Sequence, residues 1–275
     1  MKIAVLGLGI IGSAWAKNLI EDKLEVRCWN RSKKDFPNFE PDAAKAVEGA
    51  DFIILVVSDP PAVQGVLDQI VPKLKAGQVV IQSSTISASW TQKFAAQVEK
   101  TGAQFLESPF TGSKLAAEKR ETLFYVGGDQ KVLEKARPML QRISKTILYV
   151  GPIGSASSLK LAMNMNLAMV GQALCESLTF ARQQGISDDT FIAGLQGNAG
   201  RSPYADLKLP KLKAKDYSPQ FSVQHMNKDL GLALDSAESL DLPLTQKVKK
   251  IYEEGIKRGW KEDDVIGLIR VISKS

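Results

Sequence analysis

The sequence predicts an α/β protein, with a mostly parallel sheet in its first part and an all-helical region in its second. Three observations support this prediction. Apolar runs of strand length alternate with helix-like stretches up to Gly151. The first apolar run leads directly into the glycine-rich stretch GLGIIG. Beyond residue 152 no strand pattern is clear, and a long proline-free stretch with helical periodicity begins.

The candidate strands all lie in the first 151 residues. They read KIAVLGL, EVRCW, DFIILVV, QVVIQSS, AQFLES, TLFYVGG and TILYVG. Helix-like stretches such as IIGSAWAKNLIED and SASWTQKFAAQVEKTG lie between most of them. Alternation of this kind is typical of βαβ units. Because the runs are almost continuously apolar, we expect strands that helices cover on both faces.

The pattern becomes helical after GPIGS. Residues 155–185 are predicted to form one long helix, because apolar residues recur every three or four positions. Further helical segments read DDTFIAGLQGN, HMNKDLGLALDSAESL and LPLTQKVKKIYEEGIKRG. We therefore predict a boundary near Pro152, with domains at residues 1–152 and 153–275. The long helix would join the domains and form the floor of a cleft between them.

Composition limits the classes of function. The chain has 275 residues, 44% hydrophobic and 24% charged, with a net charge of +6, which are values typical of a globular protein. The basic residues are spread along the chain, so the charge suits a small acidic substrate and a phosphorylated cofactor better than nucleic acid.

Cysteine, histidine and hydropathy patterns indicate the cellular compartment and limit the metal and membrane sites that we expect. Cys28 and Cys175 form no CxxC pair, which indicates a reducing compartment. A single histidine, His225, rules out a histidine-rich metal site, and we expect no metal. There is no signal-peptide cleavage site and no apolar run of membrane-spanning length, so we expect a cytoplasmic protein without a membrane partner.

The stretch GLGIIG predicts a Rossmann dinucleotide-binding domain. Gly7, Gly9 and Gly12 have the spacing GxGxxG, between a strand-like run and a helical one. They would allow, in turn, a tight turn, close approach of the backbone to a pyrophosphate, and close packing of helix on strand. The expected cofactor-binding residues here are Gly7, Leu8, Gly9, Ile10, Ile11 and Gly12. A plain strand–turn–helix is the alternative interpretation.

The end of the second strand predicts which dinucleotide binds. An acidic residue at this position would hold the ribose 2′-hydroxyl of NAD and repel a 2′-phosphate. This chain has Asn30, Arg31 and Ser32 instead, followed by two lysines. Arg31 could clamp a phosphate and Ser32 could donate a further hydrogen bond. We therefore predict a preference for NADP over NAD; a solvated basic turn is the alternative.

Lys160 and Asn164 are candidates for the chemistry. They are four residues apart on the predicted long helix and therefore share one face. A lysine beside a carbonyl can protonate its oxygen as hydride arrives, and an amide can hold the same oxygen or fix the lysine. A lysine that extends along the surface to solvent is the alternative.

The chain resembles the β-hydroxyacid dehydrogenases. The motifs GLGIIG, SSTIS (83–87), SPFTGSKLAAE (108–118), GPIGSASSLKLAMN (151–164) and HMNKDLGLAL (225–234) occur in that family's order. The family includes 3-hydroxyisobutyrate dehydrogenases, tartronate semialdehyde reductases and glyoxylate/succinic semialdehyde reductases. The resemblance covers nearly the whole chain.

The resemblance implies roles for individual residues. Lys160 matches the catalytic acid/base, and Asn164 matches a substrate-binding residue. The turn Thr111-Gly112-Ser113 matches the one that grips the substrate carboxylate, with Ser108 just before it. Further cofactor-binding residues implied by the resemblance are Val57, Ser58, Asp59, Thr85 and Lys228. Asp229 would help organise the cleft, and an Asn-Arg pair such as Asn30-Arg31 occurs in the NADP-using branch.

The same residues have plainer interpretations. Without the resemblance, the turn at Thr111 could be a surface turn, and Lys228-Asp229 a solvated charge pair. His225 could be structural, because Lys160 already supplies the acid. The chain also departs from the family: Thr111 replaces a serine, Phe110 replaces a valine and could narrow the pocket, and Ala156 and Arg120 replace glycines.

The residues and the resemblance together predict NADPH-dependent reduction of a small aldehyde or keto acid, or oxidation of the matching β-hydroxyacid. An imine reductase on the same scaffold is one alternative, although Lys160 argues against it. A non-catalytic dinucleotide-binding module is another. We expect a small carboxylate-bearing substrate and a homodimer or homotetramer. The choice among substrates, the physiological direction and the stereochemistry stay open.

Overall fold

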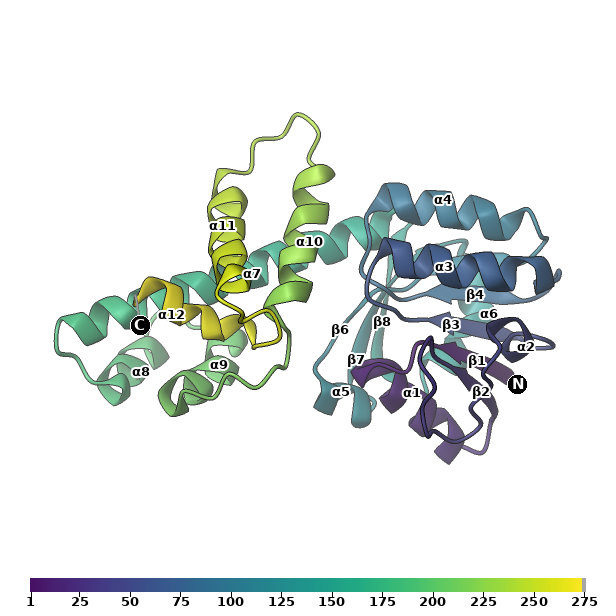
Figure 1. The fold of residues 1–275 in the computed structure, drawn as a ribbon, viewed down its shortest axis with the longest axis horizontal. Helices are drawn as coiled ribbons and strands as arrows, with labels where there is room; N and C mark the ends of the chain where they lie inside the picture. The colour runs from purple at the N-terminus through teal and green to yellow at the C-terminus, as the bar shows by residue number, and fades with distance from the viewer. Residues whose placement is uncertain (274–275) are drawn as a thin grey trace. The chain divides into compact units, whose positions relative to one another are not determined.

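The structure is a computed structural model that describes residues 1–273. Contacts divide the chain into two compact units, Met1–Leu161 and the residues from Ala162 onward. A Rossmann-like sheet occupies the first unit and helices make up the second, so the predicted fold class is confirmed (Figure 1). None of the described helices combines the length and the apolar character needed to cross a bilayer.

One sheet runs through the first unit. Its strands are β1 (Lys2–Leu6), β2 (Glu25–Trp29), β3 (Phe52–Leu55), β4 (Val79–Gln82), β5 (Gln104–Glu107), β6 (Phe110–Thr111), β7 (Thr122–Gly128) and β8 (Ser144–Gly151). The order is β2-β1-β3-β4-β5-β7-β6, and β8 pairs with β7. The pairs from β2 through β5 are parallel, whereas β7 is antiparallel to β5 and β6 and parallel to β8.

Helices cover both faces of this sheet. They are α1 (Ile10–Glu21), α2 (Ala43–Ala46), α3 (Pro60–Ile70), the 3₁₀ turn η1 (Val71–Lys73), α4 (Ala88–Glu99), α5 (Lys114–Glu118) and α6 (Gln130–Leu140). In β1, Ile3 and Val5 pack with α1 and α6, while Ala4 and Leu6 pack with α2, α3 and α4. This alternation explains why the strands read as continuously apolar. Figure 1 shows α3 and α4 side by side on one face.

The strand β8 differs from that expectation. It pairs only with β7, and Leu148 and Tyr149 are exposed. The apolar run TILYVG had predicted a strand covered on both faces. That expectation was wrong for β8, because an edge strand can be covered less completely than a central one.

The register places five strand ends in one row. Leu6 pairs with Trp29 and Leu55, Leu55 with Gln82, and Gln82 with Glu107. The loops that follow therefore leave the sheet from the same edge. The strand order also reverses direction between β1 and β3, and ligands of open α/β sheets bind outside the carboxyl ends at such a point.

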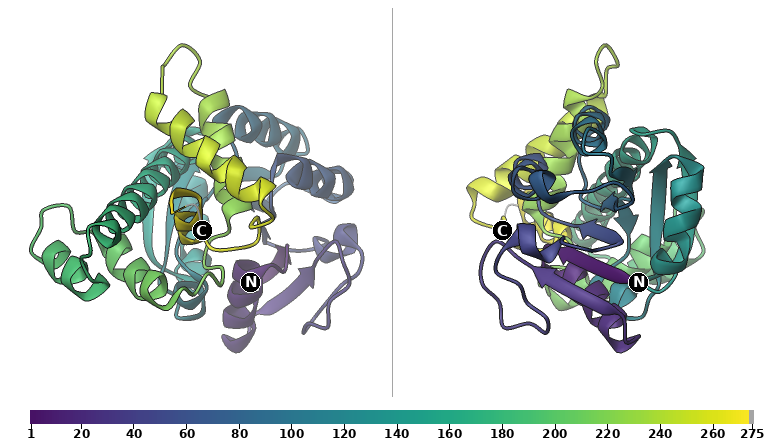
Figure 2. Two further views of the ribbon diagram at one scale, coloured as in Figure 1. Left: turned by 60° about the vertical axis from the view of Figure 1, so that its left-hand side comes forward. Right: turned by 90° about the vertical axis from the view of Figure 1, so that its right-hand side faces the viewer.

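The second unit is helical. It contains most of α7 (Ser155–Gln183), followed by α8 (Asp188–Gln196), α9 (Pro203–Ala214), α10 (Val223–Asp235), α11 (Pro243–Lys257), the 3₁₀ turn η2 (Val265–Leu268) and α12 (Ile269–Ile272). Apolar residues of α7, α10, α11 and η2 form one core cluster, and residues of α7, α9, η2 and α12 form a second. Figure 2 shows the connection between α10 and α11 projecting beyond both helices.

Candidate active site

The glycine loop lies at the carboxyl end of β1. Gly7 has φ 111°, and a Cβ atom there would lie 2.1 Å from the Val56 carbonyl oxygen. A Cβ on Gly12 would lie 1.9 Å from the Gly7 carbonyl oxygen. Both positions therefore require glycine. Gly9, in contrast, has open space around its Cβ position, as expected where a ligand approaches the backbone.

The first turn of α1 is open to an anion. Gly9 is its N-cap and supplies no side-chain hydrogen bond, whereas Asp59, Ser87, Ser113 and Asp129 cap α3, α4, α5 and α6 with their side chains. The N–H groups of that turn are therefore not used by a cap, and the positive end of the helix dipole favours a phosphate there. These residues fit the pyrophosphate of a dinucleotide.

The end of β2 is tied to the glycine loop. Asn30 accepts a hydrogen bond from the Leu8 N–H (3.0 Å) and donates one to the Ser32 carbonyl (2.9 Å). Lys34 donates to the Leu8 carbonyl, while Arg31 and Ser32 are exposed. No carboxylate occupies the position where an acid would bind a ribose. Asn30 instead supports the loop, Arg31 and Lys33 are exposed, and Lys34 holds the loop through the Leu8 carbonyl.

A hollow of about 440 Å³ lies beside the same turn of α1. Gly9, Ser13, Lys17, Lys34 and Lys114 are among the residues that line it. Glu21 and Glu118 line it too, so three lysines face two carboxylates and the lining carries only a small excess of positive charge.

Hydroxyl groups organise the ends of β3 and β4. The Val57 N–H donates to Ser84 Oγ (2.8 Å), which joins the two loops. Ser58 donates to Asp59, the N-cap of α3. Thr85 follows directly and is half-buried. The predicted residues Val57, Ser58 and Thr85 thus leave the same sheet edge as the glycine loop.

The predicted substrate turn follows β5. Ser108 is fully buried, and its hydroxyl has no hydrogen-bond partner among the described residues. Gly112 has φ 149° and is exposed, with half-buried Thr111 in β6 before it. Ser113 caps α5 by accepting from the Ala116 N–H. Gly112 leaves the backbone of this turn accessible, as a carboxylate-binding turn requires.

The Phe110 ring packs against the core. Its centroid lies 4.8 Å from that of Trp15 in an edge-to-face arrangement, and 6.4 Å from that of Phe124. The Phe110 ring therefore extends the aromatic cluster of Trp15 and Phe124.

Lys160 is on the second turn of α7, and its residue is only 7% exposed. Three residues earlier, Ser157 is bound to the buried carboxylate of Glu107 at the end of β5. The sheet edge that carries the predicted cofactor residues therefore also anchors the start of the lysine-bearing helix. Our interpretation of the sequence missed Glu107; its only signal was an acid at the end of an apolar strand.

Asn164, Lys228 and Asp229 meet within the second unit. Asn164 Nδ2 donates to Asp229 Oδ2 (2.6 Å), and Lys228 Nζ lies 2.9 Å from Asp229 Oδ1. Asp229 is 3% exposed, so Lys228-Asp229 is not a solvated surface pair. The Asn164 amide nitrogen is hydrogen-bonded to Asp229. Asn164 Oδ1 is a buried acceptor with no partner among the described residues.

His225 has a local structural partner. Its Nδ1 lies 2.6 Å from the hydroxyl of Ser222, which is the N-cap of α10. This contact links the ring to the helix cap.

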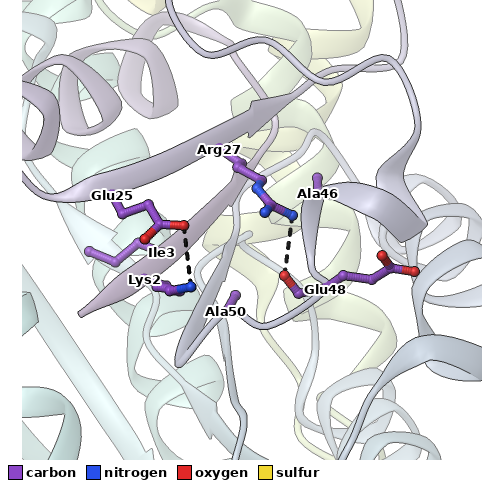
Figure 3. A pocket seen from close by; sticks show the side chains of 7 residues that line it. All are labelled: Lys2, Ile3, Glu25, Arg27, Ala46, Glu48 and Ala50. Carbon is purple, nitrogen blue, oxygen red and sulfur yellow. Dashed lines mark hydrogen bonds and ion pairs between the residues drawn. The ribbon is translucent and has the colours of Figure 1, made fainter.

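The hollow in Figure 3 is not part of this site. It lies among Lys2, Glu25, Arg27 and Glu48 at the start of β1 and β2, and its volume of about 10 Å³ suits at most one water molecule. Ion pairing between Lys2 and Glu25 closes one side. Among residues 1–273, no group of His, Cys, Asp or Glu side chains is arranged to hold a metal ion.

Comparisons with known proteins identify the family of this chain. A family model described as the NAD binding domain of 6-phosphogluconate dehydrogenase matches residues 2–151. A second, described as "NAD-binding of NADP-dependent 3-hydroxyisobutyrate dehydrogenase", matches residues 154–272. The chain belongs to the β-hydroxyacid dehydrogenase family. It is an NAD(P)-binding oxidoreductase of that family, whose members act on small hydroxyacids.

Relatives within the β-hydroxyacid dehydrogenase family match over full length. Glyoxylate/succinic semialdehyde reductase 1 of Arabidopsis thaliana is 28% identical, covering 100% of this chain and 99% of its own. The 2-hydroxy-3-oxopropionate reductase of Escherichia coli (strain K12) is 28% identical, with coverages of 99% and 97%. The structure of 3-hydroxyisobutyrate dehydrogenase from Mycobacterium tuberculosis with L-serine superposes with a TM-score of 0.90 at 26% identity, covering 98% of both chains.

Proposed function

We propose that this protein is an NADPH-dependent reductase of a small aldehyde or keto acid that carries a carboxylate, and that it also oxidises the matching β-hydroxyacid. The observation that most supports the proposal is the burial of Lys160 on a helix anchored at the sheet edge of the glycine loop. A dinucleotide bound there would supply the hydride. Lys160 would give a proton to the substrate oxygen, and its positive charge would stabilise the developing alkoxide.

The substrate carboxylate would bind at the turn Thr111-Gly112-Ser113. Support comes from the accessible Gly112 and from the unpartnered hydroxyl of Ser108 just before the turn. Asn164 would accept a hydrogen bond from a substrate hydroxyl through Oδ1, because Asp229 already engages its nitrogen. The relatives named above act on glyoxylate, succinic semialdehyde or 2-hydroxy-3-oxopropionate by their names, and these are the first substrates to screen.

Lys160→Ala tests the catalytic role. We expect turnover with the best semialdehyde to fall by about 10²-fold or more while NADPH still binds, because only proton transfer and charge stabilisation are removed. Single-turnover oxidation of bound NADPH, read by nicotinamide fluorescence, measures the step. An unchanged rate would remove Lys160 from the mechanism. Turnover of a cyclic imine with no turnover of any semialdehyde would favour an imine reductase instead.

Arg31→Ala tests the cofactor preference. Asn30 and the exposed Arg31 replace an acid, so the 2′-phosphate of NADPH would meet a guanidinium and no negative charge. We expect the affinity for NADPH to fall about tenfold or more, and that for NADH to change little. Equal losses for both dinucleotides would contradict the proposed preference.

A further inference from the structure

The beginning of α7 is capped by a side chain from a distant strand. A helix leaves its first N–H groups without intrahelical partners, and a nearby Ser, Thr, Asp or Asn normally accepts from them. Here the Gly154 and Ala156 N–H groups donate to Glu107 Oε1 (2.6 and 3.0 Å), and the Ser157 N–H donates to Oε2 (3.0 Å). The Ser157 hydroxyl donates to Oε2 as well.

Every donor at this helix end is satisfied within the first unit. The remaining N–H group, of Ser155, donates to the Pro152 carbonyl. Thr91 Oγ1 of α4 lies 2.8 Å from Ser157 Oγ, so a second element holds the same turn. Glu107 is completely buried, and its carboxylate therefore depends on these donors for the hydrogen bonds that water would otherwise supply.

The strand paired with β5 leaves room for this carboxylate. Gly127 of β7 pairs with Glu107, and a Cβ atom at Gly127 would lie 2.2 Å from Glu107 Oε1. Only glycine leaves room for the carboxylate at this position. The strand pair β5–β7 and the start of α7 are thus built around one negative charge.

We propose that Glu107 is the positioning residue for Lys160, an inference that rests on the proposed function of Lys160. Ser157 precedes the lysine by three residues, so about 4.5 Å of rigid helix separates the capped turn from the Lys160 backbone. Glu107 fixes the helix start to the end of β5 and thereby fixes where the lysine amine meets the substrate oxygen. Proton transfer is sensitive to misplacements of about 1 Å, so a loosened helix start would carry the amine out of position.

Glu107→Gln is the primary variant. It keeps the side-chain length but replaces one acceptor oxygen by an NH₂ group that would face N–H donors. A double-mutant cycle with Lys160→Ala tests whether Glu107 acts through the lysine. In the wild-type background we expect kcat for the best semialdehyde to fall by about 10²-fold, with NADPH affinity nearly unchanged. In the Lys160→Ala background the same change should alter the residual rate by less than about twofold.

The outcomes separate the positioning role of Glu107 from the catalytic role of Lys160. Loss of the same size in both backgrounds, or no loss in either, would overturn the role of Glu107 while leaving Lys160 in place. Full activity of Lys160→Ala alone would overturn the proposed function itself. Val98→Ala creates a cavity where α4 packs against the sheet, and it is the control for general destabilisation. It should leave kcat near the wild-type value.

Two milder variants keep the test decisive if Glu107→Gln does not fold. Ser157→Ala removes one donor to the carboxylate and leaves its charge intact. Thr91→Val removes the hydroxyl that contacts Ser157 Oγ and leaves the carboxylate and its N–H donors in place. Both should lower kcat several-fold in the wild-type background and have little effect without Lys160. If both variants leave kcat unchanged, Glu107 serves only the stability of the fold.

Discussion

Arg120 has a backbone φ of 61°, a conformation that residues with side chains rarely adopt. The resemblance to the β-hydroxyacid dehydrogenases had marked it as a replacement for glycine, which adopts this conformation without strain. The structure shows what the arginine contributes. Its guanidinium binds the Asp22 carboxylate at 2.8 Å and donates to the Asn18 and Arg142 carbonyls. It therefore ties the end of α1 to the loop that follows α5.

Asp22→Asn tests this contact through pH. The Arg120 hydrogen bond, together with Arg142, lowers the pKa of Asp22 below its ordinary value of 3.8. A lowered pKa stabilises the fold above the unfolded value, and the effect is lost as pH falls through the folded value. We expect Asp22→Asn to cost about 1 kcal/mol at neutral pH. Below pH 3.8 the two proteins should converge in urea denaturation; a gap that widens there would contradict the assignment.

Lys34→Met tests the support of the glycine loop. Because Lys34 donates to the Leu8 carbonyl, we expect its loss to weaken binding of NADPH and NADH together, by about tenfold or more for one hydrogen bond from a charged donor. Lys33→Met, which removes an exposed neighbouring charge, is the matched control and should have a smaller effect. Fluorescence titration with both dinucleotides measures the difference. Equal losses from the two variants would indicate general electrostatic attraction instead.

At the scale of elements, most of the chain could be predicted from its apolar periodicity. The parallel strands and α7 follow directly from it, with α7 ending at Gln183 instead of the predicted residue 185. The helix α9 was not among the predicted segments, because Pro203 and Pro210 both fall within it. Pro203 occupies the first turn, where a missing N–H costs nothing. Local sequence cannot reveal that tertiary packing retains the helix beyond the second proline.

A buried ion pair connects α9 to η2 in the helical unit. Lys208 Nζ lies 2.7 Å from Asp264 Oδ1, and both side chains are almost completely buried. Asp264 also accepts from the Gln220, Phe221 and Ile266 N–H groups. Burial lowers the pKa of Lys208 from its ordinary value, although Asp264 opposes this shift. The carboxylate thus organises the chain between two elements far apart in sequence.

Lys208→Met should therefore be strongly destabilising, because it leaves the Asp264 charge buried without its cation. We expect a loss of about 3–5 kcal/mol in the free energy of unfolding. Lys211→Met is the matched control on the same helix: its partner Asp216 is exposed to solvent, and its loss should cost about 1 kcal/mol or less. Urea denaturation followed by circular dichroism compares the two. Similar costs would show that the buried pair adds nothing beyond a surface one.

At the scale of the whole molecule, the sequence predicted the fold class and the strands whose ends carry the candidate cofactor residues. It could not predict the contacts that hold them. The Glu107 carboxylate and its donors on Gly154, Ala156 and Ser157 are 47 to 50 residues apart. Spacing within one element reveals helical faces and strand ends, but contacts between distant segments depend on packing that only the folded chain defines.

The helical unit also supports a proposal about assembly. Among its described residues, six large apolar side chains are exposed: Met163, Phe180, Ile186, Leu207, Leu240 and Leu244. We propose that the protein forms a homodimer or homotetramer through this unit. Phe180→Glu should lower the mass measured by light scattering, because a charge would have to be buried at the interface. Leu115→Glu in α5 is the control, and a monomeric wild type would contradict the proposal.

Burial of both cysteines makes the chain well suited to fluorescent labelling. Cys28 and Cys175 are inaccessible, and desolvation raises the pKa of each thiol to about 12, so neither forms a thiolate readily at neutral pH. A cysteine introduced at exposed Asp35, close to but outside the predicted phosphate-binding residues Arg31 and Ser32, would be the single reactive thiol. A maleimide dye attached there would report directly on occupancy of the adenosine end, without any need for turnover.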